Sequence, residues 1–382
     1  MNNSAKLKEK ILGFFLTEKM SLKNWDKAGI LTREIAPYNI LAQYFKKIYL
    51  FTYDGREELH YAKYLAPNIE IVYKKWRMRA RDYRWLLPFL NWKKVRECNF
   101  WKTNQLKARA ALVAKIIKPR GKLILRTGWT QSLFQVKQKG KADKKIIWWE
   151  RIAYALADAA LVTSEGDRQY LLEKYKIKPE KIEVIANYID TDKFAPETSD
   201  KHDRRITYSG KIEEQKNLNT LIRALEGTDI ALDIIGGPMD EKSELLKKEL
   251  ERLAEGLKVE LTFTGRRPND ELPKLLNKYK IYVLPSLYEG MPKSLLEAMS
   301  MGLACIGTRV EGTKEIIKDG ETGLLTENNF EDIRKKILSI INDDDRQRKL
   351  GESARRFVVD NFSLKTQINK EINIYEKLIS KN

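Results

Sequence analysis

Cysteine and long apolar runs are both scarce in this chain of 382 residues. Its two cysteines, Cys98 and Cys305, have no spacing typical of a metal or redox site, so a reducing compartment is expected. The longest apolar stretches, such as 153–162, fall short of the roughly 20 residues that a membrane-spanning helix needs. The apolar run ILGFFL near the start is shorter than the roughly 7–15 apolar residues of a secretion signal. These absences predict a cytoplasmic protein.

Acidic residues are scarce in the first third of the chain. Residues 1–122 hold 27 Lys and Arg against 10 Asp and Glu, whereas residues 201–330 hold 20 against 22. The excess is densest in 74–122, which has 16 basic and 2 acidic residues and begins KKWRMRARDYRWLLPFLNWKKVR. This asymmetry indicates an anionic partner for the first half. Basic residues among aromatics suit an anionic membrane surface or nucleic acid, and a solvated basic face with structural aromatics is the third interpretation.

The length predicts two domains, and the second half alternates regularly between strands and helices. Short apolar runs such as RITYSG, IALDIIGG and KIYVLPS each end at Gly, Pro or Ser before a helical segment. This alternation predicts a doubly wound parallel α/β sheet with ligands at the carboxyl ends of its strands. Similar elements occur in the first half. We place the boundary in the polar stretch 195–204, which gives domains 1–195 and 196–360, and expect 361–382 to be a helix that returns to the first domain.

The loop YSGKIEEQKNL (208–218) carries two lysines after a strand. Gly210 permits close backbone approach, and Lys211 and Lys216 could converge on a diphosphate beside a helix N-terminus. Alternatively, both lysines form ordinary surface salt bridges with Glu213 and Glu214.

A second loop, YEGMPKSLLEAMSMG (288–302), places Glu289 before a helix start and Glu297 within the helix. Pro292 suits the first turn of that helix. Carboxylates accept hydrogen bonds from vicinal hydroxyls, so the two could hold both ends of a sugar nucleotide. The N–H groups of 293–295 would remain for phosphate or sugar oxygens. The alternative is a Lys293–Glu297 pair on an exposed helix.

Together these motifs resemble family-4 retaining glycosyltransferases of the GT-B fold. SGKIEEQKNL is similar to the phosphate loop of that family, and EGMPKSLLEAMSMGLACIGTRVEGTKEII is similar to its block of two glutamates. IEVIANYIDTDKFAP resembles its interdomain segment, and TFTGRRPNDEL its loop beside the base. The resemblance implies two Rossmann-like domains facing a central cleft.

The resemblance also implies roles for individual residues. Glu289 would bind donor-sugar hydroxyls and Glu297 the ribose, while Lys211 and Lys216 would hold the diphosphate and stabilise the leaving nucleotide. Glu289, Lys211 and Lys216 are thus the candidate catalytic residues. Lys211 stands where the family usually has Arg, so bidentate geometry is lost there. The candidate donor-binding set is Gly210, Lys211, Lys216, Gly265, Arg266, Glu289, Gly290, Met291, Lys293, Ser294, Leu295 and Glu297.

Neither a metal nor a resident cofactor is predicted. The Asp-x-Asp of IDTDK (189–193) lies far in sequence from the phosphate loop and is interpreted as structural. The lysines and a helix dipole would supply the positive charge, and the substrate would be a UDP- or GDP-sugar.

On the acceptor side, Gly29 fits a first strand-to-helix loop. Family members often carry a histidine near the reacting sugar, but this chain has only His60, expected on a helix, and His202, expected in the linker. In the corresponding loop, LILRTGWTQS, Arg126 or a neighbouring polar group is the candidate, and the catalytic base is unassigned.

The resulting hypothesis is a metal-independent retaining hexosyltransferase at the inner face of the plasma membrane. Its acceptor would be a lipid-linked glycan in surface polysaccharide synthesis, and no nucleic acid is expected as partner. The alternatives are a GT-B-fold sugar-nucleotide epimerase, a glycan phosphorylase that needs pyridoxal phosphate, and a nucleic-acid- or membrane-binding protein built on an inactive transferase domain.

Overall fold

The chain forms two compact units. The computed structural model describes residues 6–18, 20–105, 109–128, 130–198 and 201–380. Unit 1 comprises Met1–Ala186 and Ile368–Asn382, and unit 2 comprises Asn187–Gln367. The polar stretch 195–204, in which the sequence predicts the domain boundary, falls within unit 2 in this division. Within the described ranges, no helix combines the length and apolar character needed to cross a bilayer.

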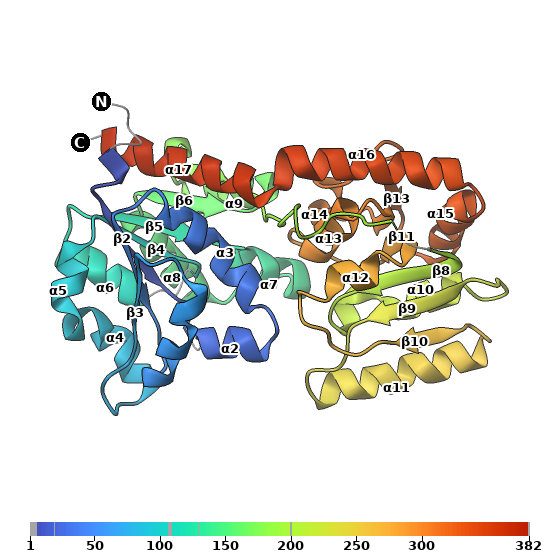
Figure 1. Cartoon of the computed structure of the whole chain (residues 1–382), viewed down its shortest axis with the longest axis horizontal. Helices are drawn as coiled ribbons and strands as arrows, with labels where there is room; N and C mark the ends of the chain where they lie inside the picture. Colours follow the sequence, from blue (N-terminus) through green and yellow to red (C-terminus); the bar gives the residue numbers. More distant parts are fainter. Residues whose placement is uncertain (1–5, 19, 106–108, 129, 199–200, 381–382) are drawn as a thin grey trace. The chain divides into compact units, whose positions relative to one another are not determined.

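In its described residues, unit 1 contains a parallel sheet of seven strands in the order β3-β2-β1-β4-β5-β6-β7 (Figure 1). Runs such as ILGFF and KIYLF are buried almost throughout, which is typical of a parallel sheet covered on both faces. The strands are β1 (Ile11–Phe15), β2 (Lys47–Phe51), β3 (Ile69–Val72), β4 (Phe100–Thr103), β5 (Lys122–Arg126), β6 (Ala159–Val162) and β7 (Ile182–Val184). The helices are α2 (Leu22–Lys27), α3 (Leu31–Ala42), η1 (Arg56–Tyr64), α4 (Ala80–Leu90), α5 (Trp92–Glu97), α6 (Arg109–Ile117), α7 (Gln131–Lys139), α8 (Lys144–Leu156), α9 (Glu165–Tyr175), η2 (Pro179–Lys181) and most of α17 (Leu364–Ser380).

Helices cover both faces of the unit 1 sheet. Tyr38 of α3 packs against Phe14 of β1 with tilted rings 4.4 Å apart between centroids, and Tyr375 of α17 meets Phe100 of β4 edge-on at 5.1 Å. From β1 the chain moves to β2 on one side, whereas the connections that lead to β4, β5 and β6 move across the sheet in the opposite direction. Because such connections are right-handed, α3 lies on one face of the sheet and α4, α6 and α8 lie on the other. The last segment of the chain therefore completes the core of the first unit.

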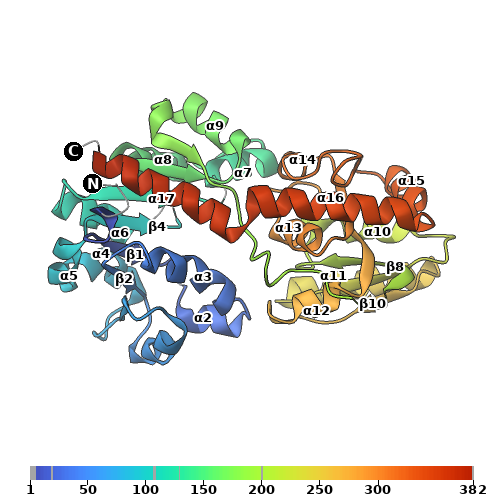
Figure 2. The ribbon, with the colours of Figure 1, turned by 45° about the horizontal axis from the view of Figure 1, so that its top comes forward.

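Unit 2, over its described residues, has a parallel sheet of six strands in the order β10-β9-β8-β11-β12-β13. Strands β8 and β10 of this sheet are labelled in Figure 2. The strands are β8 (His202–Ser209), β9 (Ala231–Ile235), β10 (Leu261–Phe263), β11 (Tyr279–Leu284), β12 (Ala304–Thr308) and β13 (Leu324–Thr326). The helices are η3 (Glu214–Lys216), α10 (Leu218–Ala224), α11 (Glu241–Gly256), α12 (Leu272–Leu276), α13 (Lys293–Ser300), α14 (Glu311–Lys314), α15 (Phe330–Ile341) and α16 (Asp344–Phe362).

The doubly wound α/β class predicted for both halves is confirmed. The described chain ends in two helices, α16 and α17, because Ser363 between them is extended and its backbone bridges to Ile189. After the four-residue α14 the chain turns and buries Ile316 and Ile317. His202 begins strand β8 rather than lying in a linker.

Candidate functional site

The two loops that carry the predicted lysines and glutamates follow neighbouring strands of unit 2. Lys211 and Lys216 follow β8, and Glu289 follows β11. The two strands pair in parallel, so their carboxyl ends lie at the same edge of the sheet. From β8 the chain winds toward β9, and from β11 it winds the other way toward β12. Ligands of open α/β sheets bind at this kind of topological switch point.

Lys216 and Glu289 form an ion pair, with Lys216 Nζ 2.6 Å from Glu289 Oε1. The side chains are 15% and 7% exposed, so this is not a solvated surface contact. Gln215 fixes the same two loops, since its side-chain amide donates to Tyr288 O at 2.6 Å and its carbonyl accepts from Leu287 N at 2.8 Å. The pair holds a carboxylate and an ammonium group side by side, and the ammonium has further N–H groups for phosphate oxygens.

Glu297 lies on α13 and is only 3% exposed. Asn269 Nδ2 donates to its Oε1 at 3.1 Å, and Asn269 Oδ1 in turn accepts from Lys193 Nζ at 2.7 Å. Glu297 therefore does not lie on an exposed helix face. A buried carboxylate needs hydrogen-bond donors, and this one is oriented by an amide from a loop that follows a different strand.

The start of α13 offers backbone donors beside these carboxylates. Pro292 is the N-cap, and Leu296 N donates to its carbonyl at 3.4 Å, so the N–H groups of 293–295 precede the hydrogen-bond ladder of the helix. Ser294 Oγ accepts from Tyr282 OH at 3.0 Å, and burial raises the pKa of Tyr282 well above its ordinary value, which keeps that donor protonated. The helix start thus presents partial positive charge for an anion.

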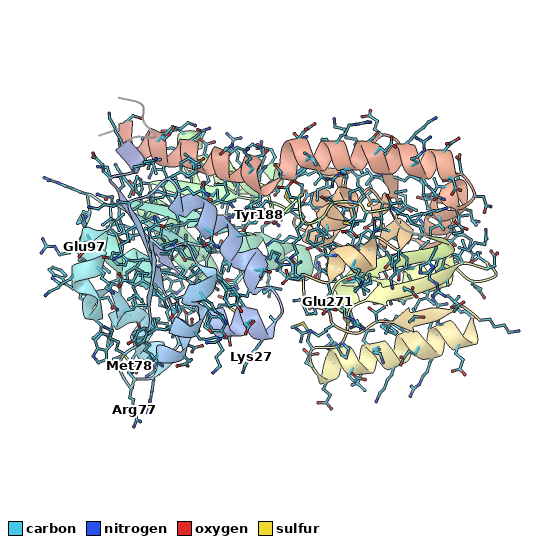
Figure 3. The ribbon with its side chains drawn as sticks, viewed as in Figure 1. Lys27, Arg77, Met78, Glu97, Tyr188 and Glu271 are labelled. Carbon is cyan, nitrogen blue, oxygen red and sulfur yellow. The ribbon has the colours of Figure 1, made fainter. Side chains whose placement is uncertain are left out.

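Met291 and Leu295, two predicted donor-site residues, have buried side chains. The Met291 carbonyl accepts from Asn187 Nδ2 at 2.8 Å and its Sδ accepts from Asn187 N at 3.1 Å. The ammonium of Lys293 lies 5.5 Å from the ring centre of Tyr188, which is labelled in Figure 3. Any ligand contact at Met291 and Leu295 would therefore come from backbone atoms.

Lys211 is placed differently from Lys216. Its side chain is 59% exposed and its Nζ lies 3.3 Å from Glu213, as in the surface salt bridge that the sequence left open. Gly210, just before it, has φ of 149°, and a Cβ there would lie 2.6 Å from Tyr208 Oη. That hydroxyl donates to Lys211 O at 2.9 Å, so the backbone at the strand end is fixed although the lysine side chain is exposed.

The loops after β9 and β10 complete this edge. Gly265 has φ of 76°, and a Cβ on Gly237 would lie 3.0 Å from the backbone nitrogen of the exposed Arg266. A Cβ on Gly236 would lie 2.0 Å from Gly210 O, so the loops after β8 and β9 are in backbone contact. The Gly-Gly pair after an apolar run is a sequence signal that could have identified Gly236 and Gly237.

Other supporting residues gave weaker sequence signals. Gly312 of α14 packs against the loop of Glu289, since a Cβ on Gly312 would lie 1.9 Å from Gly290 O and 2.9 Å from Glu289 O. Gln215 and Asn269 are ordinary polar loop residues in the sequence. Only the fold shows that they tie one loop to the next.

On the predicted acceptor side, Arg126 is 8% exposed and participates in a buried network of unit 1. Its Nη2 donates to Ala186 O at 3.1 Å, and its Nη1 lies 3.7 Å from Glu371 Oε2. Glu371 also accepts from Lys102 Nζ at 2.6 Å. This network accounts for the buried guanidinium, and a contact of Arg126 with an acceptor stays a prediction.

Gly29 is not in a strand-to-helix loop, contrary to the sequence prediction. Helix α2 intervenes after β1, because Ser21 Oγ accepts from Asn24 N at 3.1 Å and starts a helix there. Gly29 lies between α2 and α3 with φ of 67° and donates to Asp26 O at 2.8 Å, as a helix-ending glycine does. His60 lies exposed on η1.

The Asp-x-Asp of the segment 189–193 has a local structural role. Asp190 Oδ1 accepts from Lys193 N at 3.1 Å, and Ile189 pairs with the chain after α16. In the part of the chain that is described, no group of three His, Cys, Asp or Glu side chains is placed to hold a metal ion.

Two Rossmann-like units, with lysines, carboxylates and a helix start gathered at the switch point of the second, define the class of GT-B glycosyltransferases. A solved structure with this fold is Anabaena HepE in complex with UDP and glucose. It has a TM-score of 0.76 and 17% identity, and the match covers 97% of this chain and 100% of that chain. At this identity the likeness shows the fold.

Two family descriptions match successive parts of the chain. Residues 47–193 match glycosyltransferase family 4, and residues 189–357 match glycosyl transferases group 1. The chain belongs to the family-4 glycosyltransferases.

Curated relatives align over part of their length. The alpha-maltose-1-phosphate synthase of Mycolicibacterium smegmatis is 26% identical over 269 residues, which are 64% of this chain and 70% of that protein. The UDP-Gal:alpha-D-GlcNAc-diphosphoundecaprenol alpha-1,3-galactosyltransferase of Escherichia coli is 28% identical over 260 residues. That match covers 63% of this chain and 66% of the relative, just under two thirds of its length.

Proposed function

We propose that this protein transfers a sugar from a nucleotide-diphospho-sugar to a lipid-linked glycan, with retention of anomeric configuration. The observation that carries the proposal is the largely shielded Lys216–Glu289 pair at the switch point of the unit 2 sheet, together with the buried Glu297 of the helix that follows the Glu289 loop. Glu289 would accept hydrogen bonds from the donor sugar, and Glu297 from the ribose. Lys216, the exposed Lys211 and the N–H groups at the start of α13 would hold the diphosphate.

In the proposed reaction, the bond between the anomeric carbon and the diphosphate oxygen breaks, and a bond from that carbon to an acceptor hydroxyl oxygen forms on the same face. The acceptor proton goes to the departing phosphate oxygen. The lysines and the helix start stabilise charge on the leaving nucleotide, which is the main electrostatic contribution expected here. Because these groups supply positive charge at the phosphates, we propose that transfer needs no divalent metal. The donor would be a UDP- or GDP-sugar.

The choice of acceptor rests on two supporting facts. The E. coli relative is named for an acceptor on a diphosphoundecaprenol lipid, and residues 1–122 of this chain carry 27 basic against 10 acidic residues. A lipid-linked acceptor lies at a membrane, and basic surface favours an anionic bilayer. We therefore propose that the enzyme acts at the inner face of the plasma membrane. The M. smegmatis relative is named for a sugar phosphate product. A sugar phosphate should therefore be tested as acceptor beside the lipid-linked glycan.

The first experiment is a thermal-shift panel of nucleoside diphosphates and nucleotide sugars, with and without a chelator. A ligand that binds only the folded state raises the unfolding midpoint by mass action. We expect a shift for one nucleotide class, unchanged by the chelator and reduced in Lys216→Ala and Glu297→Ala. Lys248→Ala, an exposed lysine of α11, is the matched control. No shift for any nucleotide, with all variants alike, would refute the donor site.

Product analysis with the identified donor then separates the reaction types. Transfer requires an acceptor and releases a nucleoside diphosphate. An epimerase would change the nucleotide sugar without any acceptor, and a phosphorylase would release a sugar phosphate and show pyridoxal phosphate absorbance. Either result would replace the proposed reaction while leaving the nucleotide site in place.

A further inference from the structure

Unit 1 exposes an unusual concentration of large apolar side chains on α4 and α5. Trp85 is 40% exposed, Leu86 42%, Phe89 56% and Trp92 44%, all within eight consecutive residues. Trp85 and Phe89 are four residues apart on α4 and therefore share a helix face, and Trp92 opens α5 just beyond. An exposed group of this kind marks an interaction surface.

The surface continues onto α8 through a cluster of tryptophan rings. Trp85 lies 5.9 Å from Trp149, which lies 4.9 Å from Trp148, measured between ring centroids. Trp148 is 55% exposed. We call the five exposed residues Trp85, Leu86, Phe89, Trp92 and Trp148 the aromatic patch.

The side chain of Arg109 holds two tryptophan rings at the aromatic patch in place. The Arg109 guanidinium lies 5.5 Å from the ring centre of Trp85 and 5.4 Å from that of Trp149. Glu18 Oε2 accepts from Arg109 at 2.7 Å and from Arg84 at 3.1 Å. The exposed rings are thus preorganised, so less conformational entropy is lost when a partner covers them.

Exposed cations surround the aromatic patch. Arg96 lies 4.6 Å from the ring centre of Trp92, and Lys144, Lys145 and Arg151 are one helical turn from Trp148 on α8. We call these four cations, together with the exposed Lys93, the basic rim. Figure 3 shows Arg77, in the loop before α4, pointing away from the unit.

The basic rim carries positive charge at its surface. Within the described residues, no acidic side chain lies at ion-pair distance from Lys93, Arg96, Lys144, Lys145 or Arg151. The rim therefore retains positive charge available to an external anion.

We propose that the aromatic patch and its basic rim dock unit 1 on an anionic phospholipid bilayer. Tryptophan rings favour the interface between headgroups and hydrocarbon, and cations attract the lipid phosphates. Leu86 favours a bilayer over nucleic acid, because an aliphatic side chain gains from contact with hydrocarbon but does not stack on a base. The choice of a membrane as partner rests on the proposed function. The exposure and arrangement of the patch residues are independent of that function.

The test is flotation of the full chain with vesicles of phosphatidylcholine alone or mixed with phosphatidylglycerol, across a salt series. We expect binding to the mixed vesicles that weakens with salt. Phe89→Ala and Trp148→Ala should each weaken it about tenfold, and Lys93→Ala with Arg96→Ala roughly fivefold per charge removed. The matched controls on α11 of unit 2 are Leu245→Ala, from a residue 56% exposed, and Lys248→Ala with Arg252→Ala.

Two results would overturn the proposal: patch and control variants that bind vesicles equally, or tighter binding to nucleic acid than to mixed vesicles at the same salt. The nucleotide thermal shift, measured on the same preparations, separates this proposal from the donor site. A retained shift without vesicle binding refutes only the patch. Vesicle binding without any nucleotide shift refutes only the transferase function.

Discussion

Replacing Glu371 by alanine should destabilise unit 1, because it removes the acidic partner of the buried Lys102. Glu371 on α17 and Lys102 on β4 have side chains 1% and 3% exposed, and their charged atoms are 2.6 Å apart. Tyr375 OH also donates to Glu371, at 3.0 Å. Removing one member of a buried ion pair typically costs about 3–5 kcal/mol, since the other charge stays buried. For a unit of this size, each kcal/mol lowers the unfolding midpoint by about 2–4 °C, so a drop of roughly 10 °C is expected.

The assay is thermal and urea unfolding of the full chain, followed by circular dichroism, for Glu371→Ala, Lys102→Met and the double variant. The double variant removes both charges, so we expect it to lose less stability than the sum of the two single variants. If the two single losses simply add, the ion pair does not stabilise α17 on the sheet. A loss below about 1 kcal/mol for Glu371→Ala would refute the same reasoning.

The pH dependence gives an independent check. Burial raises the pKa of Glu371, but the charges of Lys102 and Arg126 outweigh it and hold that pKa below its ordinary value. A carboxyl group with a lowered folded-state pKa stabilises the fold above its unfolded pKa of about 4.3, and this contribution is lost as the pH falls through the folded value. As the pH is lowered from neutral to strongly acidic values, the free energy of unfolding should therefore fall less for Glu371→Gln than for the wild type.

Two further perturbations test the packing. Gly312→Ala would place a Cβ 1.9 Å from Gly290 O, so the loop of Glu289 must move. We expect about 1–3 kcal/mol of lost stability and a smaller nucleotide thermal shift, and an unchanged shift would contradict the packing role. Cys98 and Cys305 are buried, and burial raises the pKa of Cys98 to about 12. Both thiols should resist a disulfide reagent at mildly alkaline pH until denaturant is added, and rapid labelling of the folded chain would show that they are accessible.

Local patterns predicted much of the fold. Buried apolar runs, and the Gly, Pro and Ser residues that end them, predicted the strands of unit 2, and the two motif loops predicted lysines and glutamates at strand ends. The patterns failed where local signals were weak or competed. A serine N-cap starts α2 ahead of Gly29, and His202, expected in the linker, begins strand β8. In both places one or two residues determine where a helix or strand begins.

The sequence by itself determined the class of fold, the family and the residue types at the carboxyl edge of the unit 2 sheet, because these depend on short-range periodicity and on compact motifs. Only the tertiary structure decided that Lys216 meets Glu289, that Asn269 orients Glu297, and that Lys102 meets Glu371. The same holds for the ring contact between Trp85 and Trp149. These partners lie far apart in the chain and become neighbours through strand order and helix packing, and no local pattern carries that information.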